Sequence, residues 1–552
     1  MLTFRDKSTS FALNPVWIAA VVSLWLTVAA NLALWQAVAL ATATAGVQRW
    51  LFFTVFGVII FAAQWLITLP FAFKPLIKWL LAALCLVAAA CAYFMQTYGV
   101  LIDEGMIINS LQTDPREVRD LLDANMLVSF AGIALPALLF LYWVPVKKTS
   151  ITRQSLFNLG SMLLAVAIFI AAIFISFAEF ASLMRNHKSI RFQITPLNAL
   201  WALGQIATKP LRHTDQTLKV IGLDAKQSDA AKAAKPRLII YIVGETARAA
   251  NFSLNGYSQV TNPKLSALSQ ASDGSVLISY SEVASCGTST ATSLPCMFSP
   301  LGKDLFNSST GNSEGLLDVL QRAGIRLQWL DNNSGCKGTC DRIPNTDLSN
   351  QKDPALCTKD ECYDEILLKG FRERVKTLGA PSHTTVVLHQ KGSHGPAYYL
   401  RVPPAFKTYT PECLSNQLQT CERQAIINSY DNTIVYTDHV LASAIDQLKS
   451  LSADYDTGLI YVSDHGESLG ENNTYLHGLP YSIAPKVQKH VPLIVWLSSG
   501  LQGQLNAPAD CLKSRKTAQL SHDNLFHSLL GMNRVETALY RKDQDIFAQC
   551  SK

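Results

Sequence analysis

Residue types that bind metals follow three apolar runs after residue 236 of this 552-residue chain. The groups are Glu245-Thr246 after residues 237–244, His389 to His394 after residues 384–389, and Asp464-His465-Gly466-Glu467 after residues 457–463, with His477 farther on. Carboxylate and imidazole groups are ligands that zinc prefers. A single histidine at the end of a strand is more often structural, but three such groups in one domain favour a metal site.

The segment SCGTSTATSLPC (285–296) supplies a candidate nucleophile. Its hydroxyl side chains include those of Thr288, Ser289, Thr290 and Thr292. A threonine hydroxyl is a weak nucleophile at neutral pH, but coordination to a metal lowers its pKa and makes attack on phosphorus feasible. The same hydroxyls suit the cap of a helix N-terminus. Because a helix N-terminus also binds phosphate, the two interpretations are compatible.

These groups need a scaffold that brings them together, and the sequence predicts a doubly wound α/β sheet. Short β-branched runs predict buried, mostly parallel strands at 237–244, 325–330, 384–389, 457–463 and 491–497. The segment 428–451 has the apolar spacing of a helix. Strands that alternate with helices form a sheet covered on both faces. Ligands bind at the carboxyl ends of its strands, where the polar groups lie.

The first third of the chain has a different composition. Five stretches contain no Asp, Glu, Lys or Arg; they lie between Lys7 and Arg49, Arg49 and Lys74, Lys78 and Asp103, Asp123 and Lys147, and Arg153 and Glu179. Each is long enough for the roughly 20 residues that a membrane-spanning helix needs. We therefore expect a transmembrane domain of five helices at 1–180, a linker at 181–235 and a soluble domain at 236–552.

Loop charges predict the orientation in the membrane. The N-terminus and two connections are basic, with Arg5, Lys7, Lys74, Lys78, Lys147, Lys148 and Arg153. The loop 97–125, with Asp103, Glu104, Asp114, Glu117, Asp120 and Asp123, is mostly acidic. Basic loops stay in the cytoplasm, so the N-terminus is expected there and the C-terminal domain on the other side. A signal peptide cleaved near Ala41-Thr42-Ala43 is disfavoured, because the apolar run is too long.

Two segments beside the membrane are expected to contain helices. The loop 97–125 suits a short helix lying over the membrane face, and residues 196–211 suit either an interfacial helix or one packed on the soluble domain. The net charge of +6 fits a location near anionic head groups. No DNA- or RNA-binding motif occurs in the sequence, so nucleic acid is not an expected partner.

Cysteine usage supports an exported soluble domain. Of 12 cysteines, ten follow residue 285. An even number in an exported domain indicates disulfides, and the simplest pairing is Cys286–Cys296, Cys336–Cys340, Cys357–Cys362, Cys413–Cys421 and Cys511–Cys550. The spacing alone leaves other connectivities open. A zinc ribbon is disfavoured, since no C-x2-C pairs repeat at the required spacing.

Longer strings match a known family. VGETARAANFSLNGY, ASCGTSTATSLPCMFS, DNNSGCKGTCDR, HQKGSHGPAYYLR, SYDNTIVYTDH and SDHGESLGENNTYLHGLPY closely resemble the lipid A phosphoethanolamine transferases of the alkaline phosphatase and sulfatase superfamily. The resemblance covers essentially the whole chain. It implies a five-helix membrane domain and an α/β catalytic domain with a mostly parallel sheet between helices, in a multi-pass protein of the bacterial inner membrane whose catalytic domain is periplasmic.

The resemblance also implies roles for single residues. Glu245, Asp464 and His465 correspond to ligands of one tightly bound zinc, and Thr290 to the nucleophile and fourth ligand. His394 and His477 match positions near a second, weaker zinc or the head group of the donor. The positions implied to contact phosphoethanolamine or lipid are Asn333, Ser334, Lys337 and, in the membrane domain, Asn109.

The implied reaction has two steps. Zinc-activated Thr290 takes phosphoethanolamine from phosphatidylethanolamine, and a phosphate of lipid A then takes it from the threonine. The added ammonium group reduces surface negative charge and hence the binding of cationic peptides such as polymyxin. The alternatives are transfer to another glycan, a membrane-bound phosphatase or sulfatase, although no C/S-x-P-x-R sulfatase signature surrounds Thr290, and a non-catalytic membrane sensor. A monomer is expected, because no coiled-coil pattern occurs.

Overall fold

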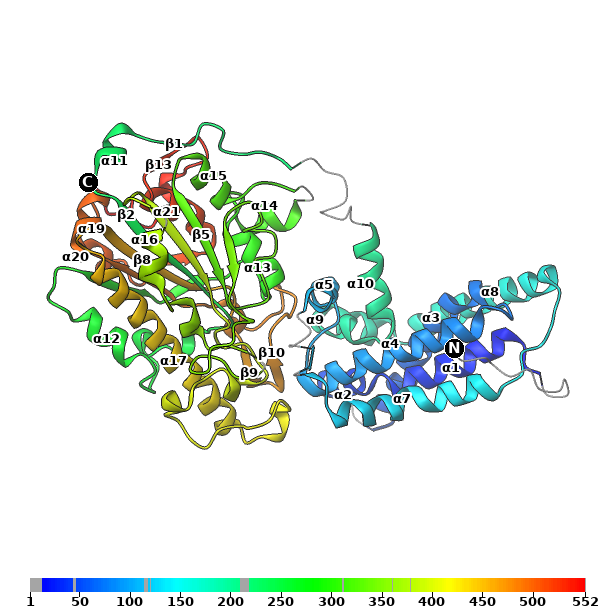
Figure 1. Ribbon diagram of the computed structural model, residues 1–552. Coiled ribbons are helices and arrows are strands. Elements are labelled where there is room, and N and C mark those ends of the chain that lie inside the picture. The colour runs from blue at the N-terminus through cyan, green and yellow to red at the C-terminus, as the bar shows by residue number, and fades with distance from the viewer. Residues whose placement is uncertain are drawn as a thin grey trace. The chain divides into compact units, whose positions relative to one another are not determined.

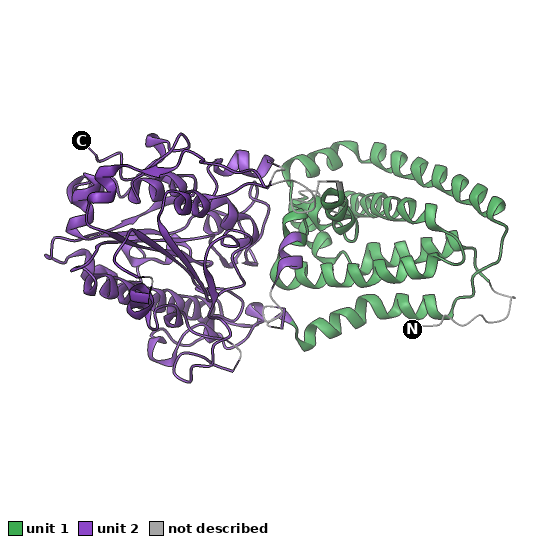
Figure 2. Ribbon diagram, turned by 45° about the horizontal axis from the view of Figure 1, so that its top comes forward, with its two compact units in different colours: residues 1–107, 122–208 green, residues 108–121, 209–552 purple. Residues whose placement is uncertain are grey.

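The computed structural model describes residues 12–42, 46–113, 118–119, 121–208, 218–309, 312–359, 361–377 and 379–551. The chain divides into two compact units, one of residues 1–107 and 122–208 and the other of residues 108–121 and 209–552 (Figure 2). Arg5, Lys7, Ala43, Asp114, Glu117, Asp120 and part of the 181–235 linker, on which sequence predictions rest, lie outside the described residues. The predicted domain boundaries stay predictions.

The first unit is helical. Its helices are α1 (Pro15–Ala29), α2 (Leu32–Ala41), α3 (Gly46–Thr68), α4 (Ile77–Tyr98), α5 (Glu104–Gln112, which continues into the second unit), α7 (Ala124–Trp143), α8 (Ile151–Ile175), α9 (Phe177–Asn186) and α10 (Leu197–Thr208). Among the described residues, α3 with the turn after it, α4, α7 and α8 are long and apolar enough to cross a membrane, and α1 with α2 makes a fifth span if this bent pair counts as one. The predicted helical membrane region is confirmed.

A buried polar side chain lies at the bend between α1 and α2. The two helices meet at 56°, and Asn31 lies between them, fully buried. Its side chain accepts a hydrogen bond from Thr195 N at 2.8 Å and donates one to Thr195 O at 2.9 Å. A buried amide in an apolar unit needs such partners, because an unsatisfied polar group is costly there.

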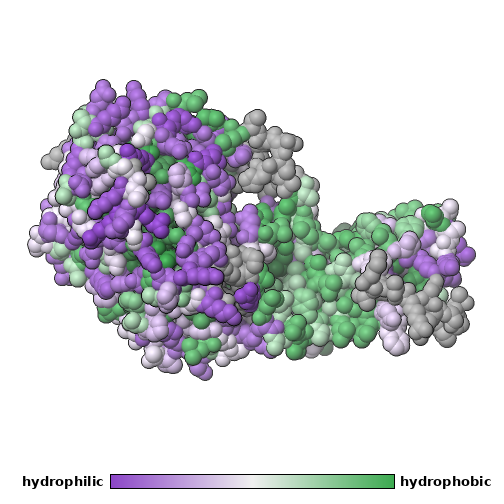
Figure 3. Space-filling model, viewed as in Figure 1, coloured by the Kyte–Doolittle hydropathy of each residue, from purple (hydrophilic) through white to green (hydrophobic). Residues whose placement is uncertain are grey.

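The surface of the helical unit is apolar, as lipid requires. Figure 3 shows hydrophobic residues gathered over these helices, whereas the visible face of the second unit is mostly hydrophilic. Among the exposed side chains are Leu24, Val28, Leu163 and Phe174, which are 56%, 58%, 66% and 76% exposed. In water such exposure would be unfavourable, but hydrocarbon chains of a bilayer would cover it.

A seven-stranded mixed sheet forms the centre of the second unit (Figure 1). Its order is β3 (Val276–Tyr280), β11 (Leu493–Leu497), β8 (Asp456–Ser463), β2 (Arg237–Gly244), β7 (Thr384–His389), β5 (Arg326–Asp331) and β6 (Asn345–Asp347). From β8 to β6 all neighbours are parallel, whereas β11 runs antiparallel to both β8 and β3. The five predicted strands lie within two residues of their expected positions, and β3 and β6 were not predicted.

Helices cover both faces of this sheet. Along β2, Leu238, Ile240 and Ile242 belong to one hydrophobic core, and the alternate residues Ile239, Tyr241 and Val243 belong to the other. The first core packs against α17 (Arg423–Ser450), and the second against α15 (Leu316–Arg322) and α21 (Asp523–Met532). Strands buried on both faces read as continuous apolar runs, which is why they were recognisable in the sequence. The predicted fold class is confirmed.

The remaining elements of the second unit are short. The strands are β1 (Lys226–Gln227), β4 (Glu282–Ala284), β9 (Ser468–Glu471), β10 (Thr474–Leu476), β12 (Gln519–Ser521) and β13 (Val535–Glu536). The helices are α11 (Asp229–Ala233), α12 (Pro263–Ser269), α13 (Thr290–Met297), α14 (Gly302–Ser308), α16 (Phe371–Thr377), α18 (Lys486–Lys489), α19 (Ser499–Leu505) and α20 (Ala509–Ser514). The ten cysteines form five disulfides, all between the neighbours named above, and Cys85 and Cys91 are free in α4.

Candidate active site

Strand register places the polar groups at one edge of the sheet. In the parallel pairs, Gly244 of β2 lies beside Ser463 of β8, Val243 lies beside His389 of β7, and His389 lies beside Asp331 of β5. Glu245 and Asp464 are the next residues along their strands. Four neighbouring strands therefore release their loops at the same carboxyl edge, where ligands bind in this class of sheet.

Four of the predicted site residues meet there in a compact group. Thr290 Oγ1 donates to Glu245 Oε2 at 3.1 Å and lies 3.4 Å from His465 Nε2. His465 Nε2 lies 3.3 Å from Glu245 Oε1 and 3.3 Å from Asp464 Oδ2. Glu245, Thr290, Asp464 and His465 are 1%, 8%, 0% and 0% exposed, so this cluster is almost wholly shielded from water.

The spacing of these atoms fits a tetrahedral zinc ion. Zinc binds imidazole and carboxylate at about 2.0–2.2 Å, and the edge of such a tetrahedron measures about 3.3–3.6 Å. Thr290 Oγ1 and His465 Nε2 both lie 3.3 Å from the same Glu245 oxygen, Oε1, and His465 Nε2 lies 3.4 Å from Thr290 Oγ1 and 3.3 Å from Asp464 Oδ2; all four distances are close to that edge. Asp464 Oδ2 is buried and accepts no hydrogen bond from the described residues. The chemistry of the donors and their spacing both suit zinc better than a hydrogen-bonded network, which would leave this oxygen unsatisfied.

The electrostatics of the cluster also favour a bound metal ion. Burial and the Glu245 carboxylate raise the pKa of Asp464 to about 7. Burial alone would lower the pKa of His465, but the Asp464 and Glu245 carboxylates outweigh it and raise that pKa to about 10. Two carboxylates side by side in a dry site repel one another, and a divalent cation is the partner that relieves the repulsion.

A strained turn fixes Glu245. The next residue, Thr246, has φ +51°, a conformation unfavourable for a β-branched residue. Its backbone is held on both sides: Thr246 N donates to Asp464 Oδ1 at 3.2 Å, and Thr246 O accepts from Tyr430 of α17 at 2.7 Å. Backbone strain persists only where the surroundings enforce it, and such positions cluster at functional sites.

The loop that carries Thr290 is anchored at several points. The Cys286–Cys296 disulfide closes it, and Cys286 N donates to His522 Nδ1 at 3.0 Å. Thr288 Oγ1 donates to Leu479 O at 2.7 Å. Thr290 is the first residue of α13, and the side chain of Ser289 makes no capping hydrogen bond. The helix N-terminus and the hydroxyl of Thr290 thus lie at the same place, as the sequence allowed.

Two further predicted residues lie beside this cluster. The His477 ring is centred 4.2 Å from that of His465 and 5.7 Å from that of His394. His477 Nδ1 is 3.3 Å from Glu467 Oε1, a carboxylate that is fully buried. Two further imidazoles and a third acidic side chain, Glu467, therefore extend the polar site beyond the cluster.

The other predicted contact residues have different surroundings. Asn333 is buried, and its amide donates to Glu245 Oε2 at 2.8 Å. Ser334 and Lys337 are partly buried in the same loop after β5, where Lys337 Nζ donates to Ser334 Oγ at 3.2 Å. Asn109 lies on α5. The structure thus places Asn333 directly on a member of the cluster.

Comparison with known proteins agrees with this architecture. Family models match at residues 237–533 (sulfatase) and 60–211 (phosphoethanolamine transferase EptA/EptB). Phosphoethanolamine transferase EptA of Escherichia coli K12 is 39% identical over 96% of this chain and 95% of its own length. Phosphatidylethanolamine transferase Mcr-1 of Escherichia coli is 36% identical, covering 88% and 90%. The structure of the integral membrane lipooligosaccharide phosphoethanolamine transferase A from Neisseria meningitidis superposes with a TM-score of 0.90 at 33% identity, covering 97% and 99%.

The chain belongs to the phosphoethanolamine transferase family. The resemblance to the phosphoethanolamine transferases that was inferred from the sequence is therefore confirmed. The sulfatase family model covers all strands from β2 to β11 and ends one residue after α21 (Asp523–Met532).

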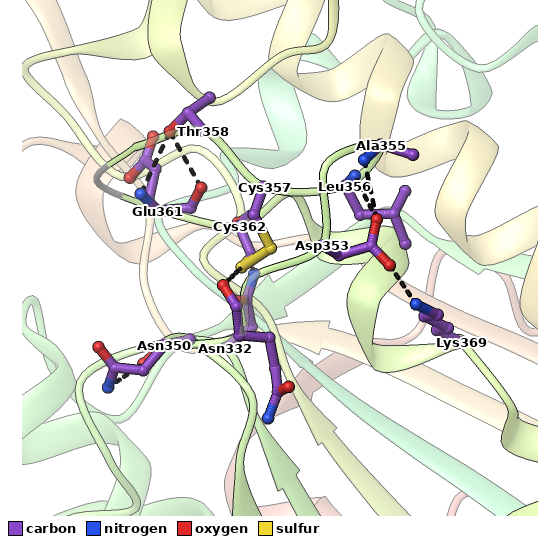
Figure 4. Close-up of a disulfide and its surroundings, with 12 residues drawn as sticks. Asn332, Asn350, Asp353, Ala355, Leu356, Cys357, Thr358, Glu361, Cys362 and Lys369 are labelled. Atoms are coloured by element: carbon purple, nitrogen blue, oxygen red, sulfur yellow. Dashed lines mark hydrogen bonds and ion pairs between the residues drawn. A yellow bond between two sulfur atoms is a disulfide. The ribbon is translucent and has the colours of Figure 1, made fainter.

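In this member of the phosphoethanolamine transferase family, the Cys357–Cys362 disulfide lies beside Asn332, in the loop after β5 (Figure 4). Cys362, bonded to Cys357, accepts a hydrogen bond on its carbonyl from Asn332 Nδ2 at 3.0 Å. The same amide donates to Asp364 Oδ1 at 2.8 Å, and Asp364 accepts from Gly392 N at 2.9 Å. The disulfide loop thereby joins the loop after β5 to the loop after β7.

Sequence reasoning did not single out Asp331 and Asp364, and it named Glu467 only as the end of the polar run 464–467 after a strand, without a role of its own. All three are buried acidic residues near strand ends or in the loops that follow them. Asp331 and Glu467 carry a signal in the sequence, because each lies next to residues that were singled out. Asp364 carries none, since only the fold brings it to residues 391 and 392.

Proposed function

We propose that this protein transfers phosphoethanolamine from phosphatidylethanolamine to a phosphate of lipid A. The observation that carries the proposal is the hydroxyl of Thr290, which lies 3.1–3.4 Å from Glu245 and His465 in a buried group completed by Asp464. Membership of the family supports the transfer of phosphoethanolamine. Two relatives, a phosphatidylethanolamine transferase and a Kdo(2)-lipid A phosphoethanolamine 7''-transferase, support the donor and an acceptor that contains lipid A.

Four side chains would bind the metal, and one of them, Thr290, attacks the phosphorus. Zinc held by Glu245, Thr290, Asp464 and His465 would lower the pKa of the threonine hydroxyl and balance negative charge on the phosphoryl oxygens. Thr290 Oγ1 attacks the phosphorus of the donor, the bond to diacylglycerol breaks, and the diacylglycerol oxygen takes up a proton. A phosphate oxygen of lipid A then attacks the phosphoethanolamine-threonine and releases Thr290.

Nearby imidazoles suit the proton transfers and the charged substrate. His477 and His394 adjoin the cluster, and an imidazole is the usual acid or base at neutral pH. The same pair could hold a second, weaker zinc. Ser334 and Lys337, on the loop after β5, supply a hydroxyl and a positive charge for the phosphoethanolamine group.

The proposed location follows from the substrates and the loop charges. Both substrates are lipids, so a membrane domain keeps the catalytic domain, residues 236–552, where they are concentrated. We place the protein in the bacterial inner membrane, as a monomer with a cytoplasmic N-terminus and a periplasmic catalytic domain. The periplasm is an oxidising compartment, in which five disulfides persist. The modified lipid A would carry less negative charge and bind polymyxin more weakly.

Mass spectrometry of lipid A tests the proposal. Cells that express the protein should add one phosphoethanolamine mass to lipid A, and cells that express Thr290→Ala at the same level should not. An unmodified lipid A in the presence of folded wild-type protein would refute the acceptor. In that case, release of diacylglycerol from phosphatidylethanolamine by the purified protein would indicate another glycan acceptor or hydrolysis by water, and no release would refute the donor as well.

A further inference from the structure

We propose that Asp331 and His389 orient Asn333, and that Asn333 in turn holds Glu245 in the position of a metal ligand. The inference rests on the zinc site of the proposed function and assigns to these three residues a positioning role that is distinct from contact with substrate.

Backbone register brings the first two residues together. Asp331 ends β5, His389 ends β7, and the two are direct neighbours across this parallel pair. His389 Nδ1 lies 2.9 Å from Asp331 Oδ2, to which Trp329 Nε1 also donates at 2.8 Å. Although burial opposes ionisation, His389 and Trp329 hold the pKa of Asp331 at about 2, so its carboxylate only accepts hydrogen bonds. His389 must therefore carry a proton on Nδ1.

The third residue, Asn333, has one possible orientation. Its Oδ1 accepts from Ser334 N at 2.8 Å, which turns Nδ2 the other way. There Nδ2 donates to Glu245 Oε2 at 2.8 Å and to Gln390 O at 2.9 Å, and it lies 3.3 Å from His389 Nε2. The two amide hydrogens satisfy the two oxygens. Asp331 Oδ1 also accepts a hydrogen bond from the backbone N of Asn333 at 2.8 Å, so the carboxylate that pairs with His389 holds the backbone of Asn333 as well.

The result is a chain of contacts from the sheet to Glu245. Asp331, Asn333 and His389 are 5%, 7% and 0% exposed, so water does not compete for these hydrogen bonds. Asn333 fixes one carboxylate oxygen of Glu245 and, being neutral, adds no charge that competes with a cation. Hydrogen bonds that orient metal ligands in this way typically change metal affinity about 10–100-fold when they are removed.

Zinc affinity of the full-length protein in detergent tests the inference. The variants are Asn333→Ala and Asp331→Asn, measured by competition with a chromophoric chelator. Asparagine at 331 offers one acceptor oxygen in place of two, so it cannot accept hydrogen bonds both from Asn333 N and from His389 Nδ1. Both variants should bind zinc about 10–100-fold more weakly than the wild type.

A matched control separates positioning from general damage. Asp318 of α15 is also a buried carboxylate and is 6% exposed. It pairs with Arg342 and has no contact with Glu245. Asp318→Asn should lower the melting temperature and leave zinc affinity within about twofold of the wild type. If Asn333→Ala does not fold, His389→Gln tests the same chain and should weaken zinc binding in the same direction.

The double variant decides whether the residues act in series. If Asp331 acts through Asn333, the pair Asp331→Asn with Asn333→Ala should bind zinc no more weakly than Asn333→Ala alone. Multiplicative losses, or wild-type zinc affinity in both single variants, would overturn the inference. An altered KM for the donor with unchanged zinc affinity would also overturn it and assign Asn333 to substrate. A wild-type protein that binds no zinc would instead refute the proposed function itself.

Discussion

Replacing Gly392 by alanine should displace Glu245 while leaving every proposed ligand side chain unchanged. Gly392 has φ +53°, and a Cβ there would lie 2.7 Å from the carbonyl oxygen and 2.9 Å from the amide nitrogen of Glu245. Both contacts are with backbone, so no side chain can rotate away. The loop is also tied to this residue, because Ser393 N donates to Glu245 O at 3.0 Å. Either the loop or Glu245 has to move.

The expected loss in the free energy of unfolding has two parts. An alanine in the left-handed region costs about 1–2 kcal/mol. A clash in packed surroundings adds about 1–3 kcal/mol. Gly370 provides the matched control, because it has φ +66° and a Cβ there would meet no atom within 4 Å. Gly370→Ala should therefore lower the free energy of unfolding only by the cost of the left-handed backbone. The difference in free energy of unfolding between the two variants measures the cost of the clash.

The assay combines stability with zinc binding. Thermal unfolding of the full-length protein in detergent should show a lower midpoint for Gly392→Ala than for Gly370→Ala, and zinc affinity should fall in Gly392→Ala alone. Equal midpoints and equal zinc affinities in the two variants would refute the reasoning, because they would mean that the loop after β7 relaxes without moving Glu245.

Three further outcomes follow from the same structure. Dialysis against a chelator should abolish phosphoethanolamine transfer and added zinc should restore it, whereas activity that survives complete zinc removal, measured by elemental analysis, would contradict the metal site. Replacing Cys511 and Cys550 by serine opens a loop with a sequence separation of 39 and should lower the free energy of unfolding by about 4 kcal/mol in denaturant titrations of the catalytic domain; an unchanged midpoint would contradict this. Burial raises the pKa of Asp545 to about 6, so its folded state takes up a proton more readily than the unfolded state. Its stabilising contribution is therefore complete below about pH 4 and lost as the pH rises through 6, and Asp545→Asn should flatten the fall in melting temperature across that window.

Local patterns in the sequence were sufficient for most of the fold. A charge-free run longer than about 20 residues forms a helix in lipid whatever surrounds it, so the membrane helices could be located from composition. The buried strands β2, β7 and β8 were equally visible, because both faces are apolar. The strands β3 and β6 were missed, since five and three residues carry too little pattern. The antiparallel direction of β11 depends on the connection before it, which no local pattern records.

The same division applies to the candidate site. The residue types at the strand ends predicted that Glu245, Asp464 and His465 would lie together, because parallel strands release their loops at one edge. Family resemblance, and not spacing, distinguished Thr290 from its neighbouring hydroxyls. Only the tertiary structure decided that Asp331, His389 and Asn333 lead to Glu245. That chain depends on which strands are neighbours, on their register and on side-chain orientation, and these are determined by packing between segments far apart in the sequence.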